Sequence, residues 1–164
     1  MTNKTLVIYY SHSNGNTKRI AGMVQKALHA DIAELEVVTP YTGTYDEVVA
    51  QGQREVESKF QPALKPLDVP FDQYDTIAIG TPTWWYTMAP AVLSFLSSHS
   101  WEGKTVMPFM THAGWPGHVI KDMKKVCVGA TFQHDKQIRF DADGGDQMVT
   151  PEAELQQWLA SLGD

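Results

Sequence analysis

The sequence predicts an α/β fold in which a mostly parallel, five-stranded sheet is doubly wound, with helices on both of its faces. Three observations predict it: short β-rich runs recur along the chain, amphipathic helical stripes separate them, and polar loops follow the runs. Such sheets bind ligands beside the carboxyl ends of their strands. The length of 164 residues fits one domain, which we assign to residues 1–164.

The strand candidates are short runs rich in β-branched and aromatic residues. The run at 5–10 consists mainly of β-branched and aromatic residues, which favours a strand buried on both faces. Pro108 lies inside the fourth run and cannot donate a ladder hydrogen bond, so it must face an unpaired position or a bulge. The predicted strands are 5–10, 32–38, 76–80, 104–111 and 130–132, and residues 133–147 are left unassigned.

The helix candidates show apolar residues at helical spacing. After Thr17, apolar residues at 20, 23, 24, 27 and 28 form one stripe. Gly52 weakens the second candidate, and Pro90 can occupy the first turn of the third. Thr150 is expected to cap the last helix, with Pro151 at its first position. The predicted helices are 17–28, 46–59, 91–96, 118–126 and the stripe from 155 to 162.

Composition excludes several classes of protein. The net charge is −6 and no dense basic run occurs, so nucleic acid is not an expected partner. The apolar stretch that ends at Ser11 is too short for a signal sequence or a membrane span, so we expect a cytoplasmic protein without a membrane partner. Cys127 is the only cysteine, which excludes an internal disulfide, and we interpret it as a core residue.

The loop between the first strand and the first helix is dense in donors. The free amides at a helix start carry partial positive charge and bind a phosphate where a Gly permits close approach. Neither a Walker loop nor the three-glycine dinucleotide fingerprint is present. Taken alone, the loop fits a helix cap as well as it fits a phosphate site. The candidate donors are Ser11, Ser13, Asn14, Asn16 and Thr17.

Three adjacent aromatic residues, Trp84, Trp85 and Tyr86, follow the third strand at the rim where this fold places its ligand. An indole can stack on a planar isoalloxazine, which gains about 0.5–1.5 kcal/mol beyond the burial of area. We expect one of the two indoles to pack under the following helix, and we predict Trp85 as the flavin platform.

The fourth strand run leads into a second donor-rich loop, at 111–117. The hydroxyl of Thr111, the imidazole of His112 and the amides exposed by Gly114 could hydrogen-bond the pyrimidine edge of a flavin. We assign His112 to binding rather than catalysis, and interpret His12 and His118 as ordinary surface groups. We predict no catalytic residue and no metal site.

Together, the segments 9–17, 80–85 and 108–114 resemble the flavodoxin family, and the likeness spans nearly the whole chain. The resemblance implies strand order 2-1-3-4-5, with flavin mononucleotide (FMN) held across the three loops. The chain is most similar to the small single-domain members of that family. It assigns the phosphate to Ser11, Ser13, Asn14, Gly15, Asn16 and Thr17, one side of the ring to Pro82, Thr83, Trp84, Trp85 and Tyr86, and the other edge to Thr111, His112 and Gly114.

The chain departs from the family pattern in two places. Asn14 precedes Gly15 where the family holds a hydroxyl, so an amide donor would replace it. Electron-transfer flavodoxins often place a Gly beside the flavin N5, where a peptide flip stabilises the one-electron-reduced flavin, whereas residues 81–89 contain no Gly. Positive φ costs a non-Gly residue about 1–2 kcal/mol, so we expect this form to be less favoured.

Three functions remain open at this point. The first is a flavodoxin-type electron carrier that docks with redox partner proteins, which suits a small acidic domain. The second is an FMN-dependent NAD(P)H:quinone or nitro-compound reductase, which needs an open pocket over the ring and is expected to be a dimer. The third is a flavin-free binding or signalling module on the same fold, which would be colourless.

Overall fold

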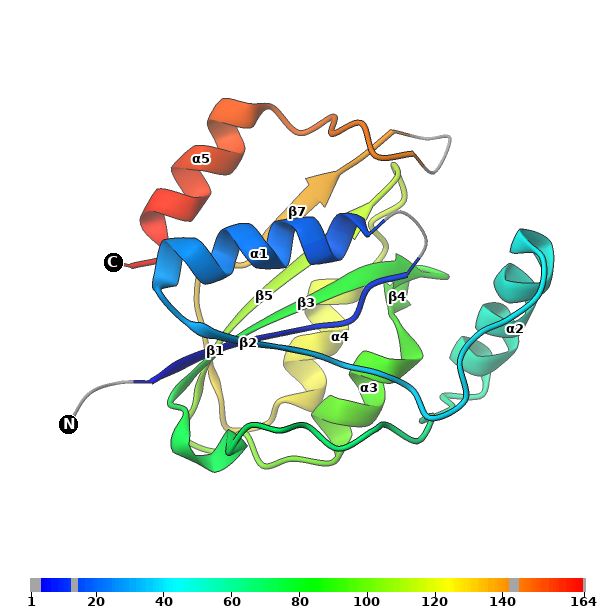
Figure 1. The fold of residues 1–164 in the computed structure, drawn as a ribbon, viewed down its shortest axis with the longest axis horizontal. Coiled ribbons are helices and arrows are strands. Elements are labelled where there is room, and N and C mark those ends of the chain that lie inside the picture. The colour runs from blue at the N-terminus through cyan, green and yellow to red at the C-terminus, as the bar shows by residue number, and fades with distance from the viewer. Residues whose placement is uncertain (1–3, 13–14, 142–144, 164) are drawn as a thin grey trace.

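A computed structural model describes residues 4–12, 15–141 and 145–163. Its parallel sheet has the order β2-β1-β3-β5-β6, which is the predicted doubly wound arrangement, and β7 also pairs with β5 (Figure 1). The strands are β1 (Thr5–Tyr9), β2 (Asp31–Glu34), β3 (Thr76–Trp84), β4 (Thr87–Met88), β5 (Thr105–His112), β6 (Thr131–Phe132) and β7 (Lys136–Arg139). The helices are α1 (Asn16–Leu28), α2 (Tyr45–Glu57), α3 (Pro90–Ser97), α4 (Val119–Val126) and α5 (Glu152–Ser161), with a 3-10 turn at Phe71–Gln73.

Helices cover both faces of the sheet, with α1 and α5 on one face and α3 and α4 on the other (Figure 1). Strand β1 contributes to both cores because its side chains alternate: Leu6 and Ile8 pack on the α3 and α4 side, and Val7 on the α1 and α5 side. All three are fully buried. Complete burial of one such side chain contributes about 1.5–3 kcal/mol, so the apolar run at 5–10 anchors the sheet.

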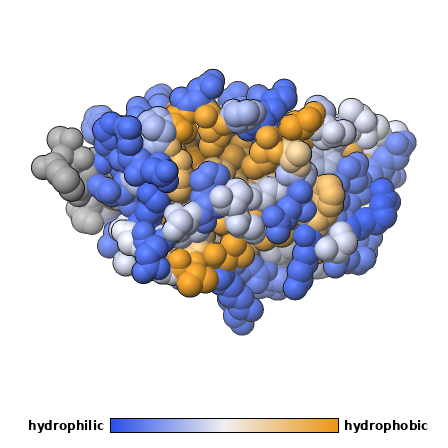
Figure 2. Space-filling model, turned by 90° about the horizontal axis from the view of Figure 1, so that it is seen from below, coloured by the Kyte–Doolittle hydropathy of each residue, from blue (hydrophilic) through white to orange (hydrophobic). Residues whose placement is uncertain are grey.

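The face that carries α3 and α4 also carries the Pro-rich segment before β3. A groove of about 470 Å³ lies between this segment and α3. Figure 2 looks onto the molecule from this side and shows apolar patches set among hydrophilic surface. Residues 36–38 belong here rather than to β2, since Val37 pairs in antiparallel fashion with Leu64 and the amide of Val38 donates to Ala63 O, whereas the amide of Leu35 still donates to Tyr9 O of β1. The predicted strand at 32–38 was therefore too long.

The fifth strand position is filled by two short strands instead of the single run predicted at 130–132. β6 pairs with the beginning of β5 and β7 pairs with its end. Pro108 lies between these two pairings, where β5 has no partner strand on that side. The proline therefore occupies an unpaired position, as its missing N–H requires. β7 lies in the segment that the sequence left unassigned.

Thr150 does not cap α5, contrary to prediction. Its hydroxyl accepts the backbone N–H of Arg139 at 2.7 Å, and Pro151 stands one residue before the helix begins. The hydroxyl of Thr150 therefore joins β7 to the start of α5.

The segment after β3 is a hairpin rather than the loop that the sequence predicts. β3 continues to Trp84, and Trp84 pairs with Thr87 of β4 in antiparallel fashion. Trp85 and Tyr86 form the two-residue turn, with φ values of 48° and 69°. A type I′ turn needs positive φ at both positions and usually takes Asn or Gly there, so two aromatic residues hold a strained turn.

Helix α2 stands apart from the other helices, beside the carboxyl end of β3 and the β4 hairpin (Figure 1). Thr44 caps it by accepting the amide of Glu47 at 3.2 Å. Gly52 is buried, and a Cβ added there would lie 3.1 Å from the Trp84 ring. The Gly that weakens this helix by propensity is thus the residue that lets the indole pack against it.

Candidate functional site

A cavity of about 550 Å³ lies at the carboxyl ends of β1, β3 and β5, where this fold binds ligands. Its wall combines the three loops that the sequence singled out with the beginning of α2 and the segment after β7. The lining residues are His12, Asn16, Thr17, Gly43, Tyr45, Val48, Val49, Pro82, Thr83, Trp84, Trp85, Thr111, His112, Ala113, Phe140 and Gly145.

The structure brings together most, though not all, of the predicted site residues. Eight of them line the cavity, namely Asn16, Thr17, Pro82, Thr83, Trp84, Trp85, Thr111 and His112. Ser11, Gly15, Tyr86 and Gly114 lie in the same loops without lining it. Ser13 and Asn14 fall outside the described residues.

The start of α1 forms the polar end of the cavity. Gly15 precedes the helix at φ 73°, and a Cβ added there would meet no atom within 4 Å. Asn16 and Thr17, the first two residues of α1, line the cavity, so the unpaired amides of the helix start belong to this end. The side chain of Ser11 turns back instead, since its Oγ accepts the amide of Lys18 at 3.2 Å.

A buried pair of hydroxyls joins this end to the third loop. Thr17 Oγ1 lies 2.8 Å from Thr111 Oγ1, and both residues are buried. Asn16 Nδ2 donates to Gly145 O at 3.0 Å, which draws the segment after β7 onto the start of α1. The side chain of Thr17 is thus committed to positioning the loop, which leaves its backbone amide as the donor that a phosphate could use.

Trp84 forms the inner aromatic wall. Its ring makes edge-to-face contacts with Tyr41, His12 and Tyr10 at centroid distances of 4.9, 5.8 and 6.0 Å. Tyr41 in turn donates to Glu55 Oε1 of α2 at 2.6 Å. The indole that packs under a helix is therefore Trp84, and the helix is α2, not the following helix α3 as we expected.

Trp85 is the more exposed of the two indoles, at 40%. Its Nε1 donates to Val49 O of α2 at 3.0 Å, which fixes the plane of the ring at the cavity rim. Gly117 packs directly on the backbone of Tyr86, and the amide of His118 donates to Tyr86 O at 2.8 Å. The turn is therefore held from α2 on one side and from the loop before α4 on the other.

His112 lines the cavity and has a defined tautomer. The amide of Gly114 donates to His112 Nδ1 at 3.0 Å, so the proton of the neutral ring resides on Nε2. Burial, with a smaller contribution from Arg139, lowers the pKa of His112. The ring is consequently a neutral N–H donor at neutral pH.

His12 was interpreted as a surface group, but the structure places it in the cavity wall. Burial lowers its pKa as well. The sequence analysis also missed the contributions of α2, the loop before it and the segment after β7: Gly43, Tyr45, Val48, Val49, Phe140 and Gly145. The spacing of His12 within the donor-rich loop could have indicated its place, whereas nothing local to the other six could have.

The chemistry of this cavity fits FMN. One end offers the amides of the α1 start, the middle offers two indoles and aliphatic side chains of α2, and the far end offers the His112 Nε2–H and loop amides. These three regions match a phosphate, a flat apolar ring and a polar ring edge. A phosphate-only ligand would leave the aromatic wall without a partner.

The whole-chain comparison agrees with this geometry. The family described as flavodoxin matches residues 4–160. The chain belongs to the flavodoxin family. Among curated proteins, no sequence matches it.

Solved structures similar to this flavodoxin-family chain cover nearly its whole length. A candidate flavoprotein from Bacteroides eggerthii is 27% identical over 96% of each chain, with a TM-score of 0.76. Another candidate flavoprotein, from Bacteroides uniformis, is 24% identical over 97% of this chain and 99% of that one, with a TM-score of 0.77. A Lactobacillus acidophilus flavoprotein in complex with FMN is 21% identical over 96% and 99%, with a TM-score of 0.70. The last two comparisons bear on the fold alone.

Two further features are absent from the described ranges. Within 4–12, 15–141 and 145–163, His, Cys, Asp and Glu residues form no group of three that could hold a metal ion. In the same part of the chain, none of the helices combines the length and apolar character of a membrane span.

Proposed function

We propose that this chain binds FMN non-covalently and carries electrons through it to partner redox proteins. The observation that carries the proposal is that an anion-binding helix start and an aromatic wall open into one cavity, at the strand ends where ligands of this fold bind. Bound FMN would supply the capacity to accept and release electrons, and the protein would supply binding, orientation and electrostatics.

Different residues along the cavity would bind different parts of FMN. The amides at Asn16 and Thr17 would hold the phosphate, with the dipole of α1 behind them. Trp85 would cover the ring, since its indole is fixed by Val49 and remains partly exposed at the rim. His112 would donate its Nε2–H to an acceptor at the ring edge.

Aromatic residues also stand exposed around the cavity mouth. Tyr86 is 51% exposed and Trp115 58% exposed, and the loop of Trp115 contacts the backbone of Tyr86 through Gly117. Exposed aromatic surface beside a polar rim is typical of a contact site for another molecule. The net charge of −6 suits docking with a basic partner.

The direct test is flavin binding by the purified protein. FMN fluorescence should be quenched on titration, and yellow colour should remain after dialysis. W85A should weaken binding about tenfold, because it removes the stacking contribution and part of the buried ring area. W115A is the matched control, since Trp115 does not line the cavity, and it should leave the dissociation constant within about twofold. A colourless wild-type protein that leaves FMN fluorescence unchanged would refute the proposal and favour a flavin-free module.

A second candidate, an FMN-dependent reductase acting by two-electron transfer, is favoured by the turn at Trp85 and Tyr86. Reversing the peptide between them would convert the type I′ turn into type II′, whose first position is open essentially only to Gly. The next peptide is fixed as well, since Tyr86 O accepts the amide of His118. A peptide flip that favours one-electron reduction is therefore hindered.

Anaerobic reduction separates the two candidates. Stoichiometric oxidation of NADPH by the FMN-loaded protein alone, without the long-wavelength absorption of one-electron-reduced flavin during dithionite titration, would establish the reductase and exclude the carrier. Persistent accumulation of that absorption, with no reaction with NADPH, would establish the carrier.

A further inference from the structure

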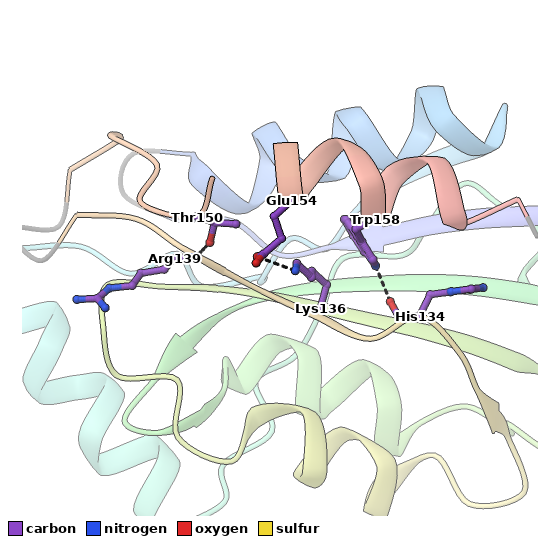
Figure 3. A network of polar contacts seen from close by, with 6 residues as sticks. All are labelled: His134, Lys136, Arg139, Thr150, Glu154 and Trp158. Atoms are coloured by element: carbon purple, nitrogen blue, oxygen red, sulfur yellow. Dashed lines mark hydrogen bonds and ion pairs between the residues drawn. The ribbon is translucent and has the colours of Figure 1, made fainter. Parts of the chain in front are cut away.

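Strand β7 places two basic side chains in contrasting environments. Lys136 Nζ donates to Glu154 Oε2 of α5 at 2.8 Å, so its charge is paired on the α5 side of the sheet. The backbone of Arg139 is tied to the same side by the hydroxyl of Thr150. Its side chain instead extends away from α5 (Figure 3). This divergence follows from strand alternation, because residues 136 and 139 lie on opposite faces.

The guanidinium of Arg139 lies against the third loop of the site. Arg139 is the register partner of His112, the last residue of β5. Gly114 has φ +114°, and a Cβ added there would lie 3.3 Å from Arg139 Nη2. A side chain at position 114 would press on this cation, so the glycine favours its close approach to the loop. The loop therefore has a positive charge against Gly114, next to the strand neighbour His112.

Arg139 supplies the positive charge beside the loop that contains His112 and Gly114. His112 is a neutral donor through Nε2, because Nδ1 accepts the Gly114 amide. Arg139 opposes protonation of that ring, which is the reason for its contribution to the lowered pKa of His112. Arg139 makes no ion pair with any residue that the structure describes. In a protein of net charge −6, a cation held against a loop that lines the cavity favours negative charge inside the cavity.

We propose that Arg139, acting together with the Nε2–H of His112, stabilises the negative charge that FMN gains on two-electron reduction and so raises the flavin's reduction potential. The inference rests on the proposed FMN binding. In this step oxidised FMN takes two electrons from a reductant, dithionite in the assay, and one proton from solvent, so that the ring gains one negative charge. Charge near the ring nitrogens is one of the means by which proteins tune a flavin. Arg139 is thus a positioning residue that acts by its field, since it does not itself line the cavity.

The test compares R139Q with K136Q, which removes the same charge from the other end of the same strand. Oxidised FMN affinity is measured by fluorescence quenching, and the two-electron potential by anaerobic equilibration with a reference dye. R139Q should lower the affinity for reduced FMN about three- to fivefold more than that for oxidised FMN, as expected of one exposed charge. This ratio corresponds to a potential about 15–20 mV lower, at about 30 mV per tenfold for two electrons.

Two additional measurements separate a field effect from a structural one. R139K keeps the charge and should restore most of the wild-type potential. The difference between wild type and R139Q should shrink at about 1 M salt, where the Debye length falls to about 3 Å. K136Q should leave the potential unchanged.

Each contrary result has a distinct meaning. If R139Q binds FMN but keeps the wild-type potential, or if K136Q shifts it equally, the role of Arg139 is refuted while FMN binding stands. If R139Q weakens oxidised and reduced FMN equally, Arg139 only supports the loop and the inference is likewise wrong. If the wild-type protein binds no FMN, the proposed function fails and this inference falls with it.

Discussion

Gly117 offers a sharp test of how the β3–β4 turn is held. A Cβ added at Gly117 would lie 2.2 Å from Tyr86 O and 2.5 Å from its Cα, and the residue has φ +59°. Because the clash is with backbone, a rotamer change cannot relieve it. G117A must therefore displace the turn, and with it Trp85 at the cavity rim.

The magnitude can be worked out against a control at the opposite end of β5. Gly103 has φ +77° with no atom within 4 Å of an added Cβ, so G103A carries only the conformational penalty of about 1–2 kcal/mol. G117A carries a similar penalty and also loses the bond from the His118 amide to Tyr86 O, worth about 0.5–1.5 kcal/mol. We expect G117A to lower the free energy of unfolding by about 1 kcal/mol more than G103A does.

Urea unfolding at equilibrium measures the difference between the two variants. With a slope of about 2 kcal/mol/M, the midpoint of G117A should lie about 0.5 M below that of G103A. FMN affinity should fall at least about fivefold in G117A and stay within about twofold in G103A, because only the former moves the aromatic turn. Equal destabilisation of the two variants, with equal FMN affinity, would refute the claim that this loop holds the turn.

Three further predictions concern the polar end of the cavity, pH and helix α1. T17V leaves the buried Thr111 hydroxyl without its partner and should lower the free energy of unfolding by about 1–3 kcal/mol. T17S keeps the hydroxyl and should retain most of the wild-type free energy of unfolding in urea titrations. Burial lowers the pKa of His12 and His112, so both favour folding fully above their ordinary pKa and progressively less as pH falls below it. The Tm should therefore drop between about pH 7 and pH 5.5, and less steeply in H12Q and H112Q; identical profiles would contradict this account. A Cβ added at Gly22 of α1 would lie in open space, so G22A should raise the free energy of unfolding by about 0.8–1.0 kcal/mol. If urea unfolding shows no gain, helix propensity does not limit the stability of α1.

Local patterns in the sequence were sufficient for the helices and the central strands. The stripe after Thr17 and the Pro at the start of α3 predicted their helices to within two residues, because amphipathic spacing and φ restriction act within one turn. The apolar run of β1 predicted burial on both faces. The order of the loops along the chain indicated the family, since parallel strands bring their carboxyl ends to one edge.

Interactions distant in sequence decided what the local patterns could not. Residues 36–38 left the sheet to pair with the segment around Leu64, and the hydroxyl of Thr150 bound β7 instead of capping α5. Both outcomes depend on partners more than ten residues away, and a local propensity does not include such partners.

The sequence alone predicted the doubly wound fold, the polar loop at the start of α1 and the aromatic residues at 84–86 as part of the site. Only the tertiary structure decided that Trp84 packs against α2 through Gly52, that Trp85 and Tyr86 form a strained turn, and that Arg139 of β7 neighbours His112 of β5. The physical reason is that periodicity and turn chemistry act between neighbours in the chain, whereas the wall of a site is set by packing between elements that meet only when the sheet has formed.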